Sequence, residues 1–128
     1  MSYHHSKLVA YSFDDSISKV TEELKKEGFG ILTEIDVKET LKKKLDVDFR
    51  KYKILGACNP TFAYKALQAE ETLGVLLPCN VVVQEKENGK VQVSFVNPME
   101  SMQVVKNPAI EEIASEVSSK LQKVLENL

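Results

Sequence analysis

Cysteine is scarce in this chain of 128 residues, which contains only Cys58 and Cys79. The two lie 21 positions apart and form no CxxC motif, so a thioredoxin-type redox pair is poorly supported. A zinc site within one chain is poorly supported too, because structural zinc takes four ligands. In a reducing compartment such cysteines are expected to be free thiols. The sequence therefore predicts no metal site within the chain.

Excess positive charge and long apolar runs are also missing. Lysine and arginine number 17 against 19 acidic residues, a net charge of −2, so no basic surface is available in bulk to neutralise phosphates. We expect no nucleic-acid partner. No apolar stretch approaches the roughly 20 residues of a membrane span, and the N-terminus lacks the apolar core of a signal peptide. We expect no membrane partner and a cytoplasmic location.

The length and composition are those of one folded domain. Hydrophobic residues make up 43% and charged residues 28%, which is ordinary for a globular protein. The length allows one core and is too short for two. We expect a single domain over residues 1–128, with a loose N-terminal segment at residues 1–6. His4 and His5 lie in that segment without a cysteine nearby in sequence, so no metal site is expected there.

Strand and helix signals alternate through the first part of the chain. A strand is predicted over residues 7–12, followed by a helix that begins at Asp14 or Asp15 and ends at Gly28. The next strand, residues 29–35, would place its isoleucines on one face.

The pattern continues with a short helix that begins at Asp36 and a third strand over residues 52–58. Gly56 inside that strand indicates a bulge or a close approach of other atoms. Asn59 and Pro60 then predict a helix start, with Asn59 as the N-cap.

A hairpin is the strongest local signal of the second half. A three-residue loop over 87–89, with Gly89 in the left-handed region, pairs Val83 with Val93 and Val81 with Phe95. The apolar run 75–85 before it is either one long strand or two strands broken at Pro78. The last helix begins at Asn107 and carries an apolar stripe for five turns, formed by Ile110, Ile113, Val117, Leu121, Val124 and Leu128.

These elements predict an α+β fold with an antiparallel or mixed sheet and the long helices on one face. The opposite face of the sheet is only partly polar, which leaves room for a dimer interface or a ligand groove.

Each cysteine is followed by asparagine at the end of an apolar run, and these two corners are the main candidate site. Cys58 precedes a helix N-terminus, whose dipole would lower the pKa of its thiol and make it nucleophilic; the alternative is a small buried residue. Asn59 is either a structural cap or a ligand contact. If the two strands are neighbours, Cys58, Asn59, Cys79 and Asn80 would face one pocket able to take an anion at the helix N-terminus.

Two charged residues are secondary candidates for ligand binding. Arg50, the only arginine, either pairs with Asp48 on the surface or makes a bidentate contact to an anion in the same groove. Glu34 is either a general base or an exposed strand residue.

Four blocks along the chain resemble the signature of the domain-of-unknown-function family 302. They are Gly-Phe-Gly at residues 28–30, Thr-Glu-Ile-Asp-Val-Lys at 33–38, Phe-Arg-Lys-Tyr-Lys-Ile-Leu-Gly-Ala-Cys-Asn-Pro at 49–60, and Leu-Leu-Pro-Cys-Asn-Val-Val-Val at 76–83. The resemblance covers nearly the whole chain. It implies a bacterial or archaeal protein with a fold similar to the TATA-binding-protein-like β-α-β(4)-α class, in a dimer. It implies no activity, and a shared fold alone would not supply DNA binding.

The leading functional hypothesis is a small homodimeric binding domain with a small-ligand pocket around the two Cys-Asn corners. The alternative is a thiol-dependent enzyme or redox protein in which Cys58 is the nucleophile and Cys79 its partner. A weaker alternative is a metal held by the thiolates of two chains. The sequence identifies no cofactor.

Overall fold

Alternating apolar and polar residues build a five-stranded antiparallel sheet in the computed structural model, which describes residues 2–128. Across the sheet the strands lie in the order β1-β5-β4-β3-β2, so the first strand is at one edge and the second at the other. The strands are β1 (His4–Val9), β2 (Gly30–Asp36), β3 (Tyr52–Cys58), β4 (Cys79–Glu85) and β5 (Val91–Val96).

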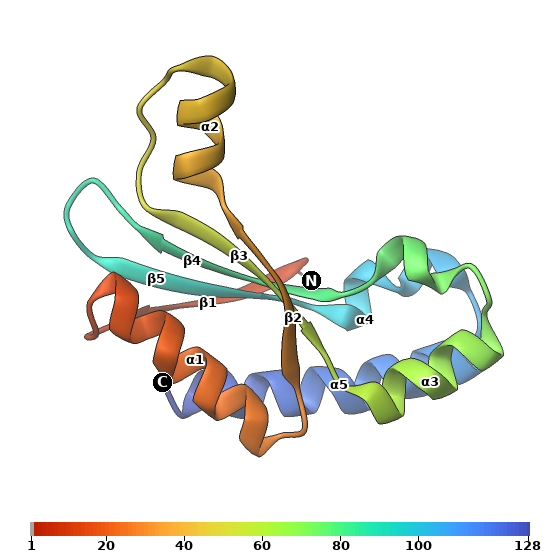
Figure 1. The fold of residues 1–128 in the computed structure, drawn as a ribbon. Coiled ribbons are helices and arrows are strands. Elements are labelled where there is room, and N and C mark those ends of the chain that lie inside the picture. The colour runs from red at the N-terminus through yellow and green to blue at the C-terminus, as the bar shows by residue number, and fades with distance from the viewer. Residues whose placement is uncertain (1) are drawn as a thin grey trace.

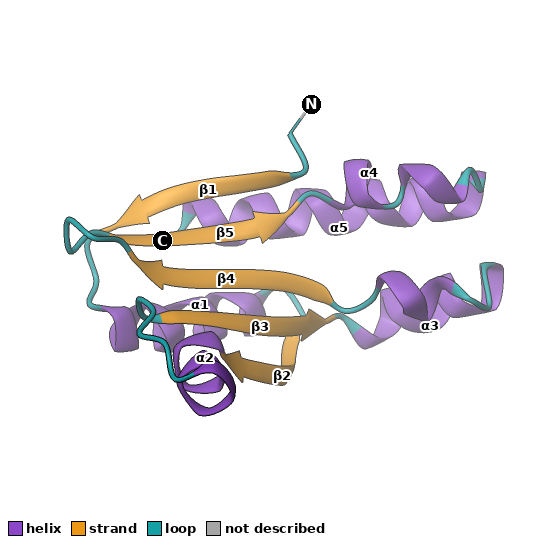
Figure 2. Cartoon of the chain, turned by 90° about the horizontal axis from the view of Figure 1, so that it is seen from above, coloured by secondary structure: helices purple, strands orange, loops and turns teal. Residues whose placement is uncertain are grey.

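Two long helices cover one face of the sheet, and a short helix rises from the other (Figure 1). The covering helices are α1 (Phe13–Lys26) and α5 (Pro108–Glu126), and the short one is α2 (Val37–Leu45). The N-terminal half of α5 extends beyond the sheet, past the ends of β3 and β5 and the start of β4, and there α3 and α4 lie beside it (Figure 2). The remaining elements are α3 (Pro60–Ala69), the 3₁₀ turn η1 (Leu73–Leu76), α4 (Pro98–Ser101) and the 3₁₀ turn η2 (Gln103–Val105). The predicted fold class is confirmed, and the sheet is antiparallel throughout.

The apolar residues of the chain form two clusters. The main cluster lies between the sheet and the helices α1 and α5, around fully buried side chains such as Leu24, Leu55 and Phe95. A smaller cluster lies outside the sheet, where α3, η1 and the end of α4 meet α5; its buried members are Ala66, Leu73, Met102, Ile110 and Ala114. The predicted stripe of α5 reaches both clusters, which is why this helix spans the length of the molecule.

The N-terminal prediction is wrong in two details. Strand β1 begins at His4, so residues 4–6 belong to the sheet and are not part of a loose segment, because they pair with β5 from Val96 to Ser94. Helix α1 is capped by Ser12, whose hydroxyl accepts from the Asp15 backbone N–H at 3.1 Å. The two aspartates lie instead in the first turn, where their negative charges interact favourably with the positive end of the helix dipole.

The hairpin prediction is confirmed in loop length and register. Val83 pairs with Val93 and Val81 with Phe95, and Gly89 has φ +81°, in the left-handed region. The run before the hairpin is a strand only from Cys79 onward, since residues 73–76 form the turn η1.

Strand β2 departs from simple alternation. Its register against β3 shifts between Ile31 and Thr33, so Ile31 packs against the main cluster while Ile35 is 48% exposed on the other face. The extra residue of such a bulge breaks the alternation of side chains, so residues before and after it that would otherwise share a face lie on opposite faces of the sheet.

Gly56 is a point of close approach between neighbouring strands of the sheet. A Cβ built at this position would lie 2.7 Å from Cγ of Pro78 and closer still to the Thr33 hydroxyl. Gly56 pairs with Thr33 on one side and Asn80 on the other, so a side chain here would push β3 away from both neighbours. The prediction that a close contact requires this glycine is confirmed.

We expect the substitution Gly56→Ala to lower the free energy of unfolding by about 1–3 kcal/mol, the usual cost of overpacking. Chemical denaturation followed by circular dichroism measures it. The matched control is Gly30→Ala in β2, where a built Cβ meets nothing within 4 Å. Equal stability of the two variants would contradict the steric role assigned to Gly56.

Candidate ligand-binding cavity

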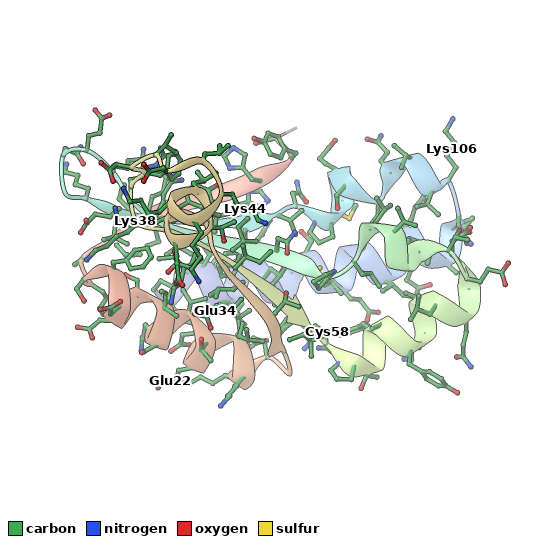
Figure 3. The ribbon with its side chains drawn as sticks, turned by 45° about the horizontal axis from the view of Figure 1, so that its top comes forward. Glu22, Glu34, Lys38, Lys44, Cys58 and Lys106 are labelled. Atoms are coloured by element: carbon green, nitrogen blue, oxygen red, sulfur yellow. The ribbon has the colours of Figure 1, made fainter. Side chains whose placement is uncertain are left out.

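A cavity of about 340 Å³ lies where the ends of β3 and β4 meet α3, α5 and η1. The corner from β3 into α3 contributes Ala57, Cys58 and Asn59, and β4 contributes Cys79. Figure 3 shows Cys58 at this corner, between the sheet and α3.

The lining of the cavity is almost entirely hydrocarbon. Among the described residues, none that line it carries a charge, and the only polar side chains are those of Cys58, Asn59 and Cys79. Exposed apolar side chains of Leu32 and Leu67 also line the cavity, and they mark where it reaches the surface.

The register of β3 against β4 decides which corner residues meet. Ala57 pairs with Cys79, so the two cysteines are neighbours on adjacent strands. Gly56 pairs with Asn80, whose side chain is exposed and lies outside the cavity lining. The two predicted corners therefore share one cavity in three of their four residues.

Asn59 does not play its predicted capping role. It occupies the N-cap position of α3, but its side chain makes no capping bond to that helix and donates through Nδ2 to the carbonyl oxygen of Glu27 at 3.3 Å. This bond ties the start of α3 to the end of α1, where Glu27 is the C-cap. Asn59 thereby holds the cavity wall in place.

The predicted lowering of the Cys58 pKa is wrong in direction. Burial raises the pKa of the Cys58 thiol, and burial, helped by the nearby Cys58, raises the pKa of the Cys79 thiol to about 11. Both groups are therefore protonated at neutral pH, whereas a nucleophilic cysteine needs its thiolate. The thiols are unpaired and contribute polarisable, weakly polar surface to the cavity.

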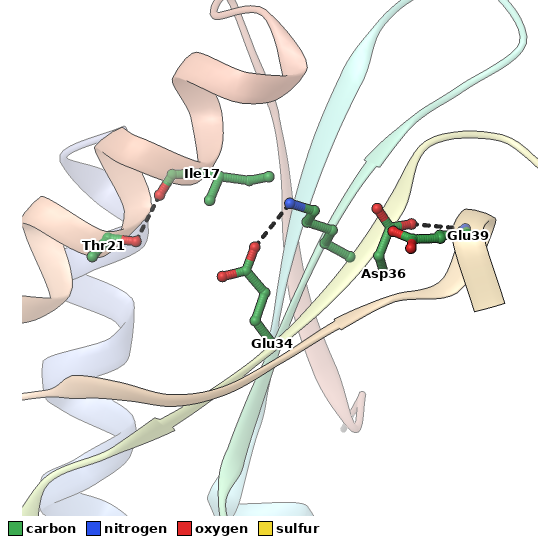
Figure 4. Close-up of polar contacts among 6 residues, drawn as sticks. Ile17, Thr21, Glu34, Asp36 and Glu39 are labelled. Atoms are coloured by element: carbon green, nitrogen blue, oxygen red, sulfur yellow. Dashed lines mark hydrogen bonds and ion pairs between the residues drawn. The ribbon is translucent and has the colours of Figure 1, made fainter.

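Glu34 lies outside the cavity lining. Its carboxylate accepts a hydrogen bond from Nζ of Lys53 at 2.8 Å, drawn in Figure 4. That bond is the main reason why the pKa of Lys53 is raised. This ion pair links β2 to β3 at the edge of the sheet.

Arg50 lies outside the cavity lining as well, before the first residue of β3, whereas the cavity is at the far end of that strand. At strand spacing this separates Arg50 from Cys58 by roughly 25 Å. Its Nε donates to Oε1 of Gln84 at 3.0 Å, and its guanidinium lies 4.4 Å from the centre of the Phe49 ring. The predicted ion pair with Asp48 is wrong, since Asp48 lies 3.7 Å from Nζ of Lys42.

Sequence reasoning missed most of the cavity wall. From the sequence, no place in a pocket was assigned to Ala63 and Ala66 on α3 or to Ala114 on α5. All three are small residues on the facing helices α3 and α5, where leucine would fill the space. Alanine at such positions is the sequence signal of this part of the cavity wall.

A family model described as "Domain of unknown function DUF302" matches residues 5–128. The chain belongs to the DUF302 family. A solved crystal structure of an uncharacterized conserved DUF302 protein from Bacillus stearothermophilus is 31% identical to it. The match covers 98% of each chain with a TM-score of 0.91. None of the curated proteins matches this chain. The predicted resemblance is confirmed, and family membership fixes the fold of this DUF302 chain without naming a reaction.

The side-chain groupings and helices of the DUF302 chain are described over residues 2–128. Within this range no three histidine, cysteine or acidic side chains are grouped so that they could hold a metal ion. No helix there combines the length and apolar character needed to cross a membrane.

The raised thiol pKa values of the DUF302 chain predict slow alkylation at neutral pH. Iodoacetamide should label the single-thiol variant Cys58→Ser, which keeps Cys79, with a rate that rises with pH toward a midpoint near 11. The Cys79→Ser variant should also label more slowly at pH 7 than a small free thiol does. A midpoint for Cys58 well below its ordinary value would contradict the burial effect and favour the thiol-enzyme hypothesis.

Proposed function

We propose that this DUF302 chain is a small-molecule-binding domain whose ligand occupies the cavity beside Cys58, Asn59 and Cys79. The observation that carries the proposal is the cavity itself. Its volume of about 340 Å³ lies in the range of small-molecule pockets, and its lining combines many apolar side chains with a few polar groups at one place. A packing defect of this size would be costly, since cavities destabilise a core in proportion to their volume.

A substitution that fills the cavity should abolish binding while the fold is kept. Ala66→Leu places an isobutyl group where the buried Ala66 lines the cavity. We expect at least a tenfold loss of affinity for α-naphthylamine, a small uncharged fluorescent probe. Fluorescence titration measures the binding, and thermal unfolding measures the fold.

The control for this prediction is Ala69→Leu, at an exposed position on the same helix that lies outside the cavity lining. It should bind the probe as the unaltered protein does. If Ala66→Leu disturbs folding, Ala114→Leu enters the cavity from α5 and serves as the second variant. Unchanged probe binding in a folded Ala66→Leu or Ala114→Leu protein would refute the proposed site.

The second part of the proposal is that the chain is a homodimer that uses the open face of the sheet. Helices α1 and α5 leave this face uncovered (Figure 1). The register places Ile54 and Val82 opposite each other on it, with Leu8, which is 51% exposed, toward the β1 edge. Apolar side chains on an uncovered sheet face favour burial against another surface. The predicted metal shared between two chains stays a prediction, and both thiols line a cavity within one chain.

Sedimentation equilibrium tests the dimer directly. We expect twice the mass of the chain for the unaltered protein and a shift toward the monomer for Val82→Lys, because a buried lysine without a partner opposes association. Ser18→Lys, at an exposed position of α1, adds the same charge away from the open face and should leave the mass unchanged. A monomer at all concentrations would contradict the dimer and leave the ligand site in place.

A further inference from the structure

Building on the proposed ligand site, we infer that its ligand is an uncharged, hydrocarbon-rich molecule of about ten carbon atoms. Its single polar group lies at the end of the cavity formed by Cys58, Asn59 and Cys79. Four features of the cavity carry this inference: its charge, its size, its polarity from end to end, and its mouth.

The charge of the ligand follows from the lining. Among the described residues no cationic or anionic side chain lines the cavity, and burial keeps both thiols neutral by raising their pKa. A carboxylate, phosphate or ammonium inside the cavity would lose its hydration without meeting an opposite charge. An uncharged ligand meets no such cost.

The N-terminus of α3 does not replace the missing charge. Pro60 is the first residue of α3 and has no N–H to offer an anion. The helix dipole is equivalent to only about half an elementary charge. The anionic ligand predicted from the sequence is therefore disfavoured relative to a neutral one.

The size of the ligand follows from the volume. At roughly 30 Å³ for each non-hydrogen atom, as in a liquid, about eleven such atoms fill 340 Å³. Ala63, Ala66 and Ala114 set this limit, because they are the small residues of the facing helices. A two-ring aromatic or a chain of about ten carbons fits.

The polarity of the cavity changes from one end to the other. The wall at the ends of β3 and β4 holds the three polar side chains, and Ala57 and Cys79 in this wall pack with the main cluster. The opposite wall is the smaller cluster, with Leu73, Met102 and Ile110, which offers hydrocarbon and one thioether. A ligand with one hydroxyl or carbonyl would place that group at the sheet end and its hydrocarbon between α3 and α5.

The mouth of the cavity is apolar too. Leu32 and Leu67 line the cavity and are 67% and 41% exposed. They lie on different elements, β2 and α3. Since none of the described residues that line the cavity, exposed or buried, is charged, these two leucines favour the entry of a hydrocarbon group.

The experiment compares three ligands of one length that differ only in the head group: n-decanol, decanoate and n-decylammonium. Each displaces α-naphthylamine from the full-length protein at pH 7. We expect n-decanol to bind at least tenfold more tightly than either charged ligand. Decanoate or n-decylammonium binding as tightly as n-decanol would overturn the inferred ligand class.

The two proposals fail in different ways. If a charged ligand binds as tightly as n-decanol and Ala66→Leu abolishes its binding, the proposed site is supported and the inferred ligand class is refuted. If the probe and all three ligands fail to bind, both proposals are refuted.

Naphthalene and β-naphthol test the polar end of the cavity, because the ratio of their affinities reports on the hydroxyl group alone. We expect the affinity for β-naphthol relative to that for naphthalene to fall at least threefold in Asn59→Leu and to stay unchanged in Ala69→Leu, which lies outside the cavity lining. An unchanged ratio in Asn59→Leu, with thiol labelling of Cys58 unaffected by β-naphthol, would overturn the orientation.

Discussion

The register between β3 and β4 is the constraint on which the site depends. Gly56 allows Thr33 and Pro78 to approach the strand from both sides, and this approach fixes Gly56 opposite Asn80 and Ala57 opposite Cys79. Because side chains alternate along a strand, a slip of one residue would turn Cys79 away from the helices and bring Asn80 toward them. The close contacts at this one glycine thus decide which residue of the second corner, Cys79 or Asn80, faces the cavity.

The division of the core into two clusters creates the space for a ligand. The sheet ends at Cys58 and Val96, yet α5 continues beyond it and needs another surface for its apolar stripe. Helices α3 and α4 and the turn η1 supply that surface, and alanines at the contact between α3 and α5 leave it incompletely filled. The cavity is therefore the seam between the two parts of the core. Asn59 secures this seam by its bond to the end of α1.

The sequence predicted the parts of the fold that local chemistry controls. The hairpin register was predictable because Gly89 needs the left-handed region, and the last helix because Asn107 caps it and one stripe runs along it. The start of α1 was missed because Ser12 and two aspartates all offer an oxygen acceptor, and only the backbone path selects one. At the site, Cys58 and Cys79 were predicted to face one pocket if their strands are neighbours, which β3 and β4 are. Arg50 and Glu34 were assigned to the same site by residue type alone.

Local patterns in the sequence by themselves determined the order of strands and helices, the antiparallel hairpin and the family, because these depend on neighbouring residues and on blocks along the chain. Only the tertiary structure decided the character of the site. The pKa of a thiol depends on the burial around it, and burial at Cys58 and Cys79 opposes the thiolate that a helix N-terminus would favour. The wall of the cavity is formed by residues from β2 to α5 that meet only when the sheet and helices pack, so local patterns predicted only a part of it.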